Sequence, residues 1–374
     1  MPDLTLVMLS AGSSSRFHHK AKKQWLRIGD IPLWLHSTNT LSQLHPFSKI
    51  IVTVSSEDLP YARKFSDSIT FVEGGLSRQD SLKNALLHVS TPYVLISDCA
   101  RPCVDEAMLK RILDASPQAH CVVPFLNVVD TVAYEDATID RAHVKLIQTP
   151  QCSSTALLKQ ALQTDVEYTD ESSAIKALGG TVDYVLGNAH AKKLTCKEDI
   201  PLIPCLKAPC VTPMIGYGFD VHAYEEGKPM RLGGVEVHPT IGFRAHSDGD
   251  VVIHALIDAL LGAAGAGDIG EFFPDTDARY KDIDSQILLR EVCTFLERVG
   301  FEIRHCDITI MAEFPKLGHM KDAIRFALSK TLGLGAHHVN VKATTTEKLG
   351  FVGRKEGVAV SATATLNYLD WKNV

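Results

Sequence analysis

A proline-rich segment in the middle of the chain limits the possible folds more than any other feature. Residues 200–213 contain four prolines, at positions 201, 204, 209 and 213. Proline lacks the backbone N–H that a helix interior or a central strand needs, so the segment favours a stiff, extended connector. Because domains usually contain about 100–200 residues, a chain of 374 residues divided at this point predicts two domains. We expect a first domain at 1–205, a linker at 206–213 and a second domain at 214–374.

Composition and charge exclude several classes of protein. The 45% of hydrophobic residues supports a packed core and argues against wholesale disorder. The sequence has no long uncharged apolar run that could span a membrane, and its first residues lack the pattern of a secretion signal. A net charge of −6, with no basic excess in either half, is atypical of nucleic-acid-binding proteins. We therefore expect a cytoplasmic protein with neither a nucleic acid nor a membrane as partner.

The cysteines are scattered along the chain. There are nine of them, and no two stand in a Cys-x-x-Cys pair. This pattern is typical of neither a disulfide framework nor a thiolate zinc site. We expect free thiols in a reducing compartment.

The first part of the chain alternates between strand and helix signals. Short apolar runs predict buried parallel strands at 4–9, 50–54, 93–96 and 121–123. Ser77 and Asp80 form a capping-box pattern that predicts the start of a helix. The alternation predicts an α/β doubly wound, Rossmann-like domain, whose ligands lie at the carboxyl ends of the strands.

The second part shows a less regular pattern. Helices are predicted at 250–264, 285–299 and 321–332, and strands at 215–221, 307–311, 339–343 and 358–366. This order favours an α+β domain, in which helices pack on a mixed sheet.

A loop of small residues follows the first predicted strand. Residues 10–16 read Ser-Ala-Gly-Ser-Ser-Ser-Arg, so backbone N–H groups could approach phosphate oxygens, while Arg16 and Lys23 add positive charge. The spacing matches neither a Walker A motif nor Gly-x-Gly-x-x-Gly, and an ordinary serine-rich turn is an open alternative. Seven further motifs follow in order: Gly74-Gly75 with residues 78–81, then 97–102, Asp130-Thr131, Asp140-Arg141, 149–151, 169–171 and 193–195.

In this order the motifs resemble the 2-C-methyl-D-erythritol 4-phosphate cytidylyltransferases, across almost all of residues 1–200. The resemblance implies that CTP and methylerythritol phosphate react to give CDP-methylerythritol and pyrophosphate, with Mg²⁺ or Mn²⁺ as cofactor. Arg16 and Lys23 would be catalytic, stabilising the charge that develops on the α-phosphate. The implied substrate-binding residues are Gly12, Gly74, Gly75 and Ser81 around the nucleotide, Asp98 at the sugar and Mg²⁺, Arg101 and Thr131 along the substrate site, and Arg141 and Lys193 at the attacking phosphate. Ser14 stands where the family usually has a second glycine. A nucleotidyltransferase for another sugar or alditol phosphate is the alternative.

Three residues of the second part form a candidate metal site. Asp220 and His222 are two apart on a predicted strand and so share a face, and His254 lies on a predicted helix. One carboxylate and two imidazoles with a free fourth position are typical of catalytic zinc. A chance Asp-x-His pattern with a packed histidine is the alternative.

The motifs that follow, at 245–250, 268–270, 273–277, 312–317 and 343–351, resemble 2-C-methyl-D-erythritol 2,4-cyclodiphosphate synthase across residues 213–370. The resemblance implies that the 2-phosphate of a CDP-linked methylerythritol 2-phosphate attacks the β-phosphate, closes a cyclic diphosphate and releases CMP. Asp220, His222 and His254 would bind Zn²⁺, Glu347 would bind Mg²⁺ or Mn²⁺, and His246 and Thr345 would be catalytic. The implied substrate contacts are Asp220, His222, His246, Ser247, Asp268, Ile269, Gly270, Phe273, Pro274, Asp275, Thr276 and Asp277 towards the erythritol diphosphate, and Ala312, Pro315, Lys316, Leu317, Thr344, Thr345, Thr346 and Glu347 towards CMP.

The second resemblance also implies a homotrimer whose active sites lie between neighbouring subunits. Phe351 and Arg354 match positions that line a central cavity for an isoprenoid diphosphate. If the first domain forms dimers, a hexamer satisfies both symmetries. A separate kinase must act between the two reactions, so channelling is not implied. A metal-binding oligomerisation module without activity is the non-enzyme alternative.

Overall fold

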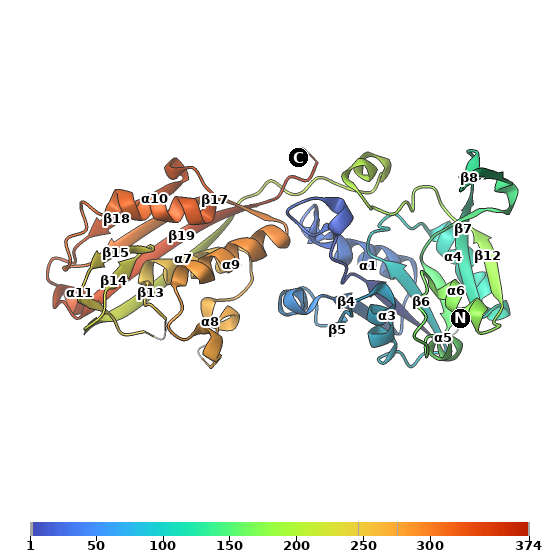
Figure 1. Ribbon diagram of the computed structural model, residues 1–374, viewed down its shortest axis with the longest axis horizontal. Helices are drawn as coiled ribbons and strands as arrows, with labels where there is room; N and C mark the ends of the chain where they lie inside the picture. The colour runs from blue at the N-terminus through green and yellow to red at the C-terminus, as the bar shows by residue number, and fades with distance from the viewer. Residues whose placement is uncertain (1–2, 246, 275, 373–374) are drawn as a thin grey trace. The chain divides into compact units, whose positions relative to one another are not determined.

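The computed structural model describes residues 3–245, 247–274 and 276–372, and it divides into two compact units (Figure 1). The first unit contains the described residues up to Pro209 together with Trp371 and Lys372, and the second is Cys210–Asp370. The division therefore falls inside the proline-rich segment, and the chain returns to its first unit after Asp370. Among the described residues, none of the helices is both long and apolar enough to cross a bilayer.

The first unit is built on an eight-stranded sheet. Its order is β10-β7-β11-β6-β1-β4-β5, with β12 beside β7. The strands are β1 (Leu4–Leu9), β4 (Lys49–Val54), β5 (Thr70–Glu73), β6 (Tyr93–Asp98), β7 (Cys121–Asn127), β10 (Lys145–Ile147), β11 (Gln151–Ser154) and β12 (Val182–Leu186). β6, β1, β4 and β5 run parallel, while β11 is antiparallel to both β6 and β7. The sheet confirms the predicted α/β class.

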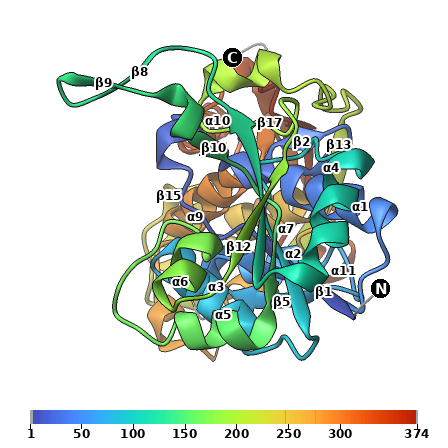
Figure 2. The ribbon, with the colours of Figure 1, turned by 90° about the vertical axis from the view of Figure 1, so that its right-hand side faces the viewer.

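Helices cover both faces of this sheet, which explains why every residue of β1 is buried. The helices are α1 (Leu33–Leu44), α2 (Leu59–Arg63), α3 (Arg78–Leu86), α4 (Glu106–Ala115), α5 (Thr155–Ala161) and α6 (Glu171–Ala177). Leu82 of α3, Leu158 of α5 and Ile175 of α6 join one buried cluster on one face, and α1 and α4 lie on the other (Figure 2). The predicted capping box is confirmed, since the side chains of Ser77 and Asp80 each accept from the other residue's backbone N–H.

A hairpin formed by β8 (Val132–Tyr134) and β9 (Ala137–Ile139) projects away from the rest of the first unit (Figure 2). Its residues are almost all exposed. The hairpin therefore adds little to the core of its own chain.

A disulfide joins Cys103 and Cys205. The prediction that all the cysteines are free thiols is therefore wrong for these two. They are separated by 102 positions, and the fold brings their Cα atoms to 5.8 Å. No short-range spacing in the sequence could signal such a pair.

Two segments that connect the units are held by the same short hairpin, formed by β2 (Arg27–Ile28) and β3 (Ile31–Pro32). The indole Nε1 of Trp371 donates to the backbone oxygen of Arg27 at 2.7 Å, and the Trp371 side chain is 2% exposed. The N–H of Gly29 donates to the oxygen of Ala208 at 3.2 Å. Trp371 is thus part of the core of the first unit.

The second unit is a five-stranded mixed sheet with helices on one face (Figure 1). Its order is β16-β13-β19-β17-β18. The strands are β13 (Met214–Glu226), β16 (Ile241–Phe243), β17 (Phe301–Met311), β18 (Val339–Thr344) and β19 (Gly357–Tyr368), with a separate pair β14 (Met230–Leu232) and β15 (Val235–His238). The helices are α7 (Val251–Ala263), α8 (Ile269–Phe272), α9 (Ser285–Arg298), α10 (Lys321–Leu332) and α11 (Gly350–Gly353). This architecture confirms the α+β prediction.

Alternation along β13 separates a helix-facing side from an outer side. A Cβ at Gly216 or Gly218 would lie 2.0 Å from a backbone oxygen of α7, so glycine permits the close approach of strand and helix. Between and beyond them, Ile215, Tyr217 and Phe219 are 72%, 63% and 50% exposed. The outer side of β13 therefore carries an uncovered apolar row.

Candidate active sites

The loop after β1 forms one wall of a cleft of about 620 Å³ in the first unit. Gly12, Arg16 and Lys23 line it, and so do Gly75 and Ser81 from across the cleft. Gly74 lies directly behind, where a Cβ would come within 2.2 Å of the Ala11 Cβ, so only glycine fits there. The structure thus gathers the predicted nucleotide-binding residues around one hollow.

Ser14 shapes this loop in place of a glycine. Its φ of 59° lies in the left-handed region that glycine favours. The Ser14 hydroxyl accepts from the Lys23 N–H at 3.0 Å and donates to the Gln24 side-chain oxygen at 2.8 Å. Gln24 in turn donates to the Gly12 oxygen at 2.8 Å. These hydrogen bonds hold the loop in a conformation that a serine would otherwise resist.

The two predicted catalytic cations differ in their surroundings. Arg16 is exposed, whereas Lys23 is half-buried. Burial lowers the pKa of Lys23, and the nearby charges of Lys193 and Arg16 lower it further. A triphosphate in the cleft would offset this repulsion between like charges.

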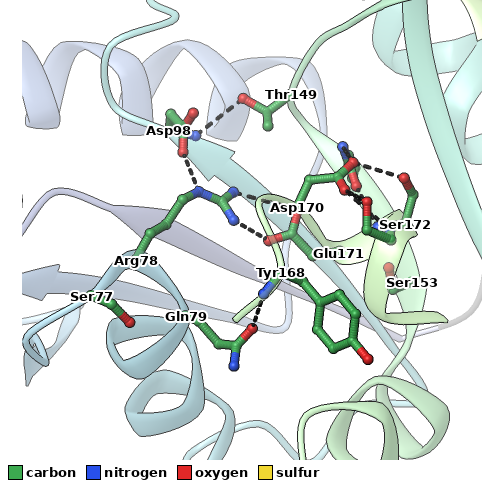
Figure 3. Close-up of polar contacts among 12 residues, drawn as sticks. Ser77, Arg78, Gln79, Asp98, Thr149, Ser153, Tyr168, Asp170, Glu171 and Ser172 are labelled. Carbon is green, nitrogen blue, oxygen red and sulfur yellow. Dashed lines mark hydrogen bonds and ion pairs between the residues drawn. The ribbon is translucent and has the colours of Figure 1, made fainter. Parts of the chain in front are cut away.

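Asp98, the last residue of β6, is the centre of a partly buried ionic cluster. Lys193 Nζ lies 2.6 Å from one carboxylate oxygen, and Arg78 Nε lies 3.2 Å from the other. Arg78 also contacts Glu171 at 2.7 Å and so lies between two carboxylates (Figure 3). Burial alone raises the pKa of Asp98, but the charges of Arg78 and Lys193 outweigh it and hold the pKa well below its usual range.

Arg78 and Glu171 were not among the predicted site residues, although both lie inside motifs found in the sequence. Burial alone lowers the pKa of Arg78, yet Glu171 and Asp98 raise it above its usual range. The Glu171 side chain is fully buried. A charged residue in each of two separate motifs was the only signal in the sequence, and it gave no reason to pair them.

A second cavity of about 340 Å³ adjoins the cleft. Arg78, Asp98 and Lys193 line both hollows, so these three residues form their common border. Arg101 lines the second cavity and donates to the Ala191 oxygen at 2.7 Å. The predicted substrate-binding residues Asp98 and Arg101 therefore lie together, next to Lys193.

The structure does not bring Thr131 and Arg141 to this border. Both are exposed at the base of the projecting hairpin, and Arg141 donates to the Val129 oxygen. Among the described residues that line the two cavities, neither appears. Within one chain, Thr131 and Arg141 therefore do not reach the cavities where we expected them to contact the substrate.

Asp220, His222 and His254 meet in the second unit. Asp220 and His222 point from β13 towards α7, which carries His254. Asp220 Oδ2 lies 3.0 Å from His222 Nε2 and 3.2 Å from His254 Nδ1. One ligand atom from each residue lies within 4.8 Å of the others, so the three could hold a metal ion. Strand alternation accounts for the shared face of Asp220 and His222, and the packing of α7 on β13 brings His254 to them.

The donor set fits a divalent cation. His222 Nδ1 is buried and has no hydrogen-bond partner among the described residues. Hydrogen bonds from His222 and His254 hold the pKa of Asp220 below its usual range, although burial alone raises it. For His254, burial alone lowers the pKa, but the hydrogen bond to Asp220 and the carboxylate charge raise it. Two imidazoles and one carboxylate this close together form a donor set that a divalent cation could bind.

Ser247 and Ser285 complete the surroundings of His254. Their hydroxyls lie 3.1 and 3.0 Å from His254 Nε2, and Ser285 also donates to Asp248 at 2.6 Å. Asp250 has a different role, because its carboxylate caps α7 and accepts from the N–H groups of Gly233 and Gly234. No pattern in the sequence pointed to Ser285.

The predicted erythritol-binding loop, residues 268–277, follows His254 in the sequence. The Asp268 side chain caps α8, and the N–H of Ile269 donates to Asp258 at 2.9 Å. Phe273 is buried, while Gly270, Pro274 and Thr276 are exposed, and Asp277 pairs with Arg279 at 2.6 Å. His246 and Asp275 lie outside the described residues.

A second group of predicted residues gathers at the end of β18. The N–H of Ala312 donates to the Thr344 oxygen at 3.0 Å, which places the segment with Pro315, Lys316 and Leu317 next to residues 344–346. Thr345 Oγ1 lies 3.3 Å from a carboxylate oxygen of Glu347. Glu347 does not belong to the Asp220, His222 and His254 group found among the described residues. Further on, Phe351 is 37% exposed and Arg354 pairs with Glu356 at 2.7 Å.

The family model of 2-C-methyl-D-erythritol 4-phosphate cytidylyltransferase matches residues 4–205, and that of the YgbB family matches residues 214–367. A bifunctional enzyme IspD/IspF of Aliarcobacter butzleri is 55% identical over 372 residues, which is 100% of both chains. Its counterpart in Sulfurimonas denitrificans is 53% identical over 371 residues and covers 99% of this chain and 96% of its own.

This chain belongs to the bifunctional IspD/IspF family. The solved structure of the bifunctional IspDF from Campylobacter jejuni agrees, with a TM-score of 0.88 and 46% identity over 99% of this chain and 100% of that chain. As a family member the chain is an enzyme with two activities of the methylerythritol phosphate pathway to isoprenoids. It is a cytidylyltransferase in its first part and a cyclodiphosphate synthase in its second.

Proposed function

We propose that the first domain, residues 1–205, transfers CMP from CTP to the 4-phosphate of methylerythritol at the border between the cleft and the second cavity. The observation that carries this proposal is the shared position of Asp98 and Lys193 in both hollows. A nucleotide in the larger cleft and a phosphorylated polyol in the smaller one would meet at these two residues.

The residues of the first domain supply position and charge. The attacking phosphate is already a nucleophile, so no protein base is required. Lys23 and Arg16 stabilise the charge that grows on the α-phosphate, and Lys193 orients the attacking phosphate. A divalent cation, Mg²⁺ or Mn²⁺ near Asp98, would neutralise the leaving pyrophosphate when bound.

Pyrophosphate release with CTP and methylerythritol phosphate tests this assignment. Lys23→Ala should lower kcat/KM by about 10²-fold or more, in line with the loss of a group that stabilises transition-state charge. Lys49→Ala is a matched control, because Lys49 is at the far end of β4 and contacts only the His88 oxygen among the hydrogen bonds described for it. Equal turnover with ribitol or hexose phosphates would instead support the broader nucleotidyltransferase alternative.

For the second domain, from residue 214, we propose that Asp220, His222 and His254 hold Zn²⁺ and that Glu347 is a ligand of a second cation, Mg²⁺ or Mn²⁺. Support comes from the short distances within the trio, where His222 Nε2 and His254 Nδ1 both face Asp220 Oδ2. The bound ion would polarise the β-phosphate of the CDP-linked substrate. Thr345 and Ser247 would donate hydrogen bonds to phosphate oxygens, and the 268–277 loop would position the erythritol.

Metal analysis and CMP release together test the second site. We expect close to one zinc per chain in the wild type and little in His254→Ala, together with loss of CMP release from the CDP-methylerythritol 2-phosphate. Zinc at full occupancy without CMP release in the wild type would favour the inactive oligomerisation module.

We propose a homotrimer through the second domain, in which Glu347 and residues 312–317 of one chain reach the metal trio of a neighbour. Its support is the apolar row Ile215, Tyr217 and Phe219, which lies exposed on the outer side of β13 where a neighbouring chain could cover it. In this trimer, Phe351 and Arg354 would line the central cavity. Analytical ultracentrifugation of Tyr217→Lys should show loss of trimers, and an unchanged sedimentation coefficient would contradict the interface.

We propose further that the hairpin of β8 and β9 carries Thr131 and Arg141 to the site of a second copy. Its support is the exposure of both residues away from the cavities of their own chain. Mixing Arg141→Ala chains with Lys23→Ala chains should restore part of the pyrophosphate release, since one of the two sites in a mixed dimer would be intact. With dimers and trimers together, the assembly would be a hexamer.

A further inference from the structure

The Cys103–Cys205 pair is located beside the machinery of the first unit rather than in a remote part of it. Cys103 follows β6 by five residues, in the loop that begins after Asp98 and includes Arg101. Cys205 follows the short helical turn η6 (Lys197–Leu202). Their Cα atoms are 5.8 Å apart, which falls within the range of natural disulfides.

The segment that ends at Cys205 is the one that carries Lys193. Its first part is fastened to the loop after β6 by three contacts: the Leu194 N–H donates to Ala100 at 2.8 Å, Arg101 donates to Ala191 at 2.7 Å, and Lys193 pairs with Asp98 at 2.6 Å. The disulfide fastens the far end of the same segment to the same loop. Between these two points the chain forms turns and the short η6 and buries the side chain of Ile203, and the covalent bond further limits how far the segment can move.

We propose that Cys103 and Cys205 are a reversible dithiol–disulfide pair whose oxidation fixes the Lys193 segment at the cytidylyltransferase site and whose reduction loosens it. The proposal adds a modification site to the cytidylyltransferase activity. Its chemical partner is a small-molecule disulfide or dithiol, such as glutathione.

Oxidation of the two cysteines needs no reactant other than a small-molecule disulfide. The thiolate of one cysteine attacks a small-molecule disulfide, forms a mixed disulfide and expels one thiolate. The second cysteine then attacks the protein sulfur and expels the other thiolate. Two protein thiols lose two electrons and two protons in total, and one small disulfide becomes two thiols.

Solvent access permits exchange at this pair, as it does at the partly exposed Cys196, Cys210 and Cys293, which form no disulfide. Cys103 and Cys205 are both partly exposed. By contrast, Cys99, Cys152 and Cys306 are buried, and burial raises the pKa of their thiols to about 11, 12 and 12. Because the thiolate is the reactive form, these buried cysteines are poor sites for exchange.

A covalent measurement tests the pair without reference to activity. The full chain is equilibrated in mixtures of oxidised and reduced dithiothreitol, the free thiols are trapped by alkylation, and peptides are analysed by mass spectrometry. We expect a Cys103–Cys205 peptide that appears in oxidising mixtures and disappears in reducing ones. The absence of this peptide after oxidation, or its persistence in every reducing mixture, would overturn the proposal.

Kinetics then separate a switch from a purely structural bond. In the wild type, reduction should raise KM for methylerythritol phosphate roughly threefold to tenfold, since it loosens a positioned cation without removing it. Cys103→Ser and Cys205→Ser should show the higher KM of the reduced enzyme in both oxidising and reducing buffer. Cys210→Ser changes a partly exposed cysteine outside the disulfide and should respond as the wild type does. CMP release by the second domain should be unchanged throughout.

Two results would contradict a redox switch at Cys103 and Cys205. A melting temperature that falls on reduction while KM stays constant would show a structural bond without a switch. A redox response of the same size in Cys103→Ser would assign the effect to other cysteines. Either result would refute the proposal and leave the cytidylyltransferase assignment intact.

Discussion

Arg78 and Glu171 form an ion pair of 2.7 Å in which the Glu171 carboxylate is fully buried, although they lie 93 residues apart in the chain. The pair joins the start of α3 to the start of α6, and through the second contact of Arg78 it also positions Asp98. A single guanidinium thus connects two helices to the border of the nucleotide cleft.

Removal of Glu171 should be costly, because Arg78 then keeps only Asp98 as a carboxylate partner. Glu171→Ala is expected to lower the free energy of unfolding by about 1.5–3 kcal/mol, the usual contribution of a hydrogen bond to a charged group. Lys110→Ala is the matched control, since it breaks an exposed pair with Asp114 and should change little. Urea unfolding monitored by circular dichroism measures the free energy of unfolding of both variants. A similar small decrease in the two would mean that the Arg78–Glu171 pair adds little to stability.

The pH dependence of the cytidylyltransferase should reflect Lys23. Its pKa is lowered by burial and by neighbouring cations, so it loses its charge at a lower pH than an ordinary lysine. The stabilising charge is present below this pKa and is lost as the pH rises through it, which makes kcat/KM for CTP fall on the alkaline side. Lys23→Arg should shift the fall to higher pH, because a guanidinium stays charged to about pH 12. An alkaline limb at the same pH in both enzymes would assign the titration to another group.

Substitutions at Ser14 should separate backbone strain from hydrogen bonding in the nucleotide loop. Ser14→Ala keeps the left-handed φ of 59° and loses the hydroxyl contacts to Lys23 and Gln24. Ser14→Gly loses the same contacts but relieves the strain. We expect a larger rise in the KM for CTP in Ser14→Ala than in Ser14→Gly. The reverse order in steady-state kinetics would show that the conformation does not depend on the hydroxyl.

Trp371 should stabilise the first unit despite its position at the far end of the sequence. Trp371→Ala empties a buried site and removes the hydrogen bond to Arg27, and the expected loss is about 3–5 kcal/mol. Trp371→Phe keeps most of the packing and should lose only about 1 kcal/mol. Differential scanning calorimetry should show a lower transition for the first unit alone. An unchanged transition in Trp371→Ala would mean that the docked tail contributes nothing to stability.

The sequence by itself determined the features that depend on neighbouring residues. The capping box of Ser77 and Asp80 and the bounds of α10 follow from hydrogen bonds and periodicity within a few positions. The face shared by Asp220 and His222 follows from strand alternation, and the motif order gave the family. Each of these depends on distances of only a few residues along the chain.

The tertiary structure decided which distant residues meet. It paired Cys103 with Cys205, Arg78 with Glu171 and Trp371 with Arg27. No local sequence pattern links the two residues of any of these pairs. It also left Thr131 and Arg141 away from Asp98, although their motifs had suggested one common site. The physical reason is that long-range contacts are set by how helices and strands pack together, and local patterns carry no record of that packing.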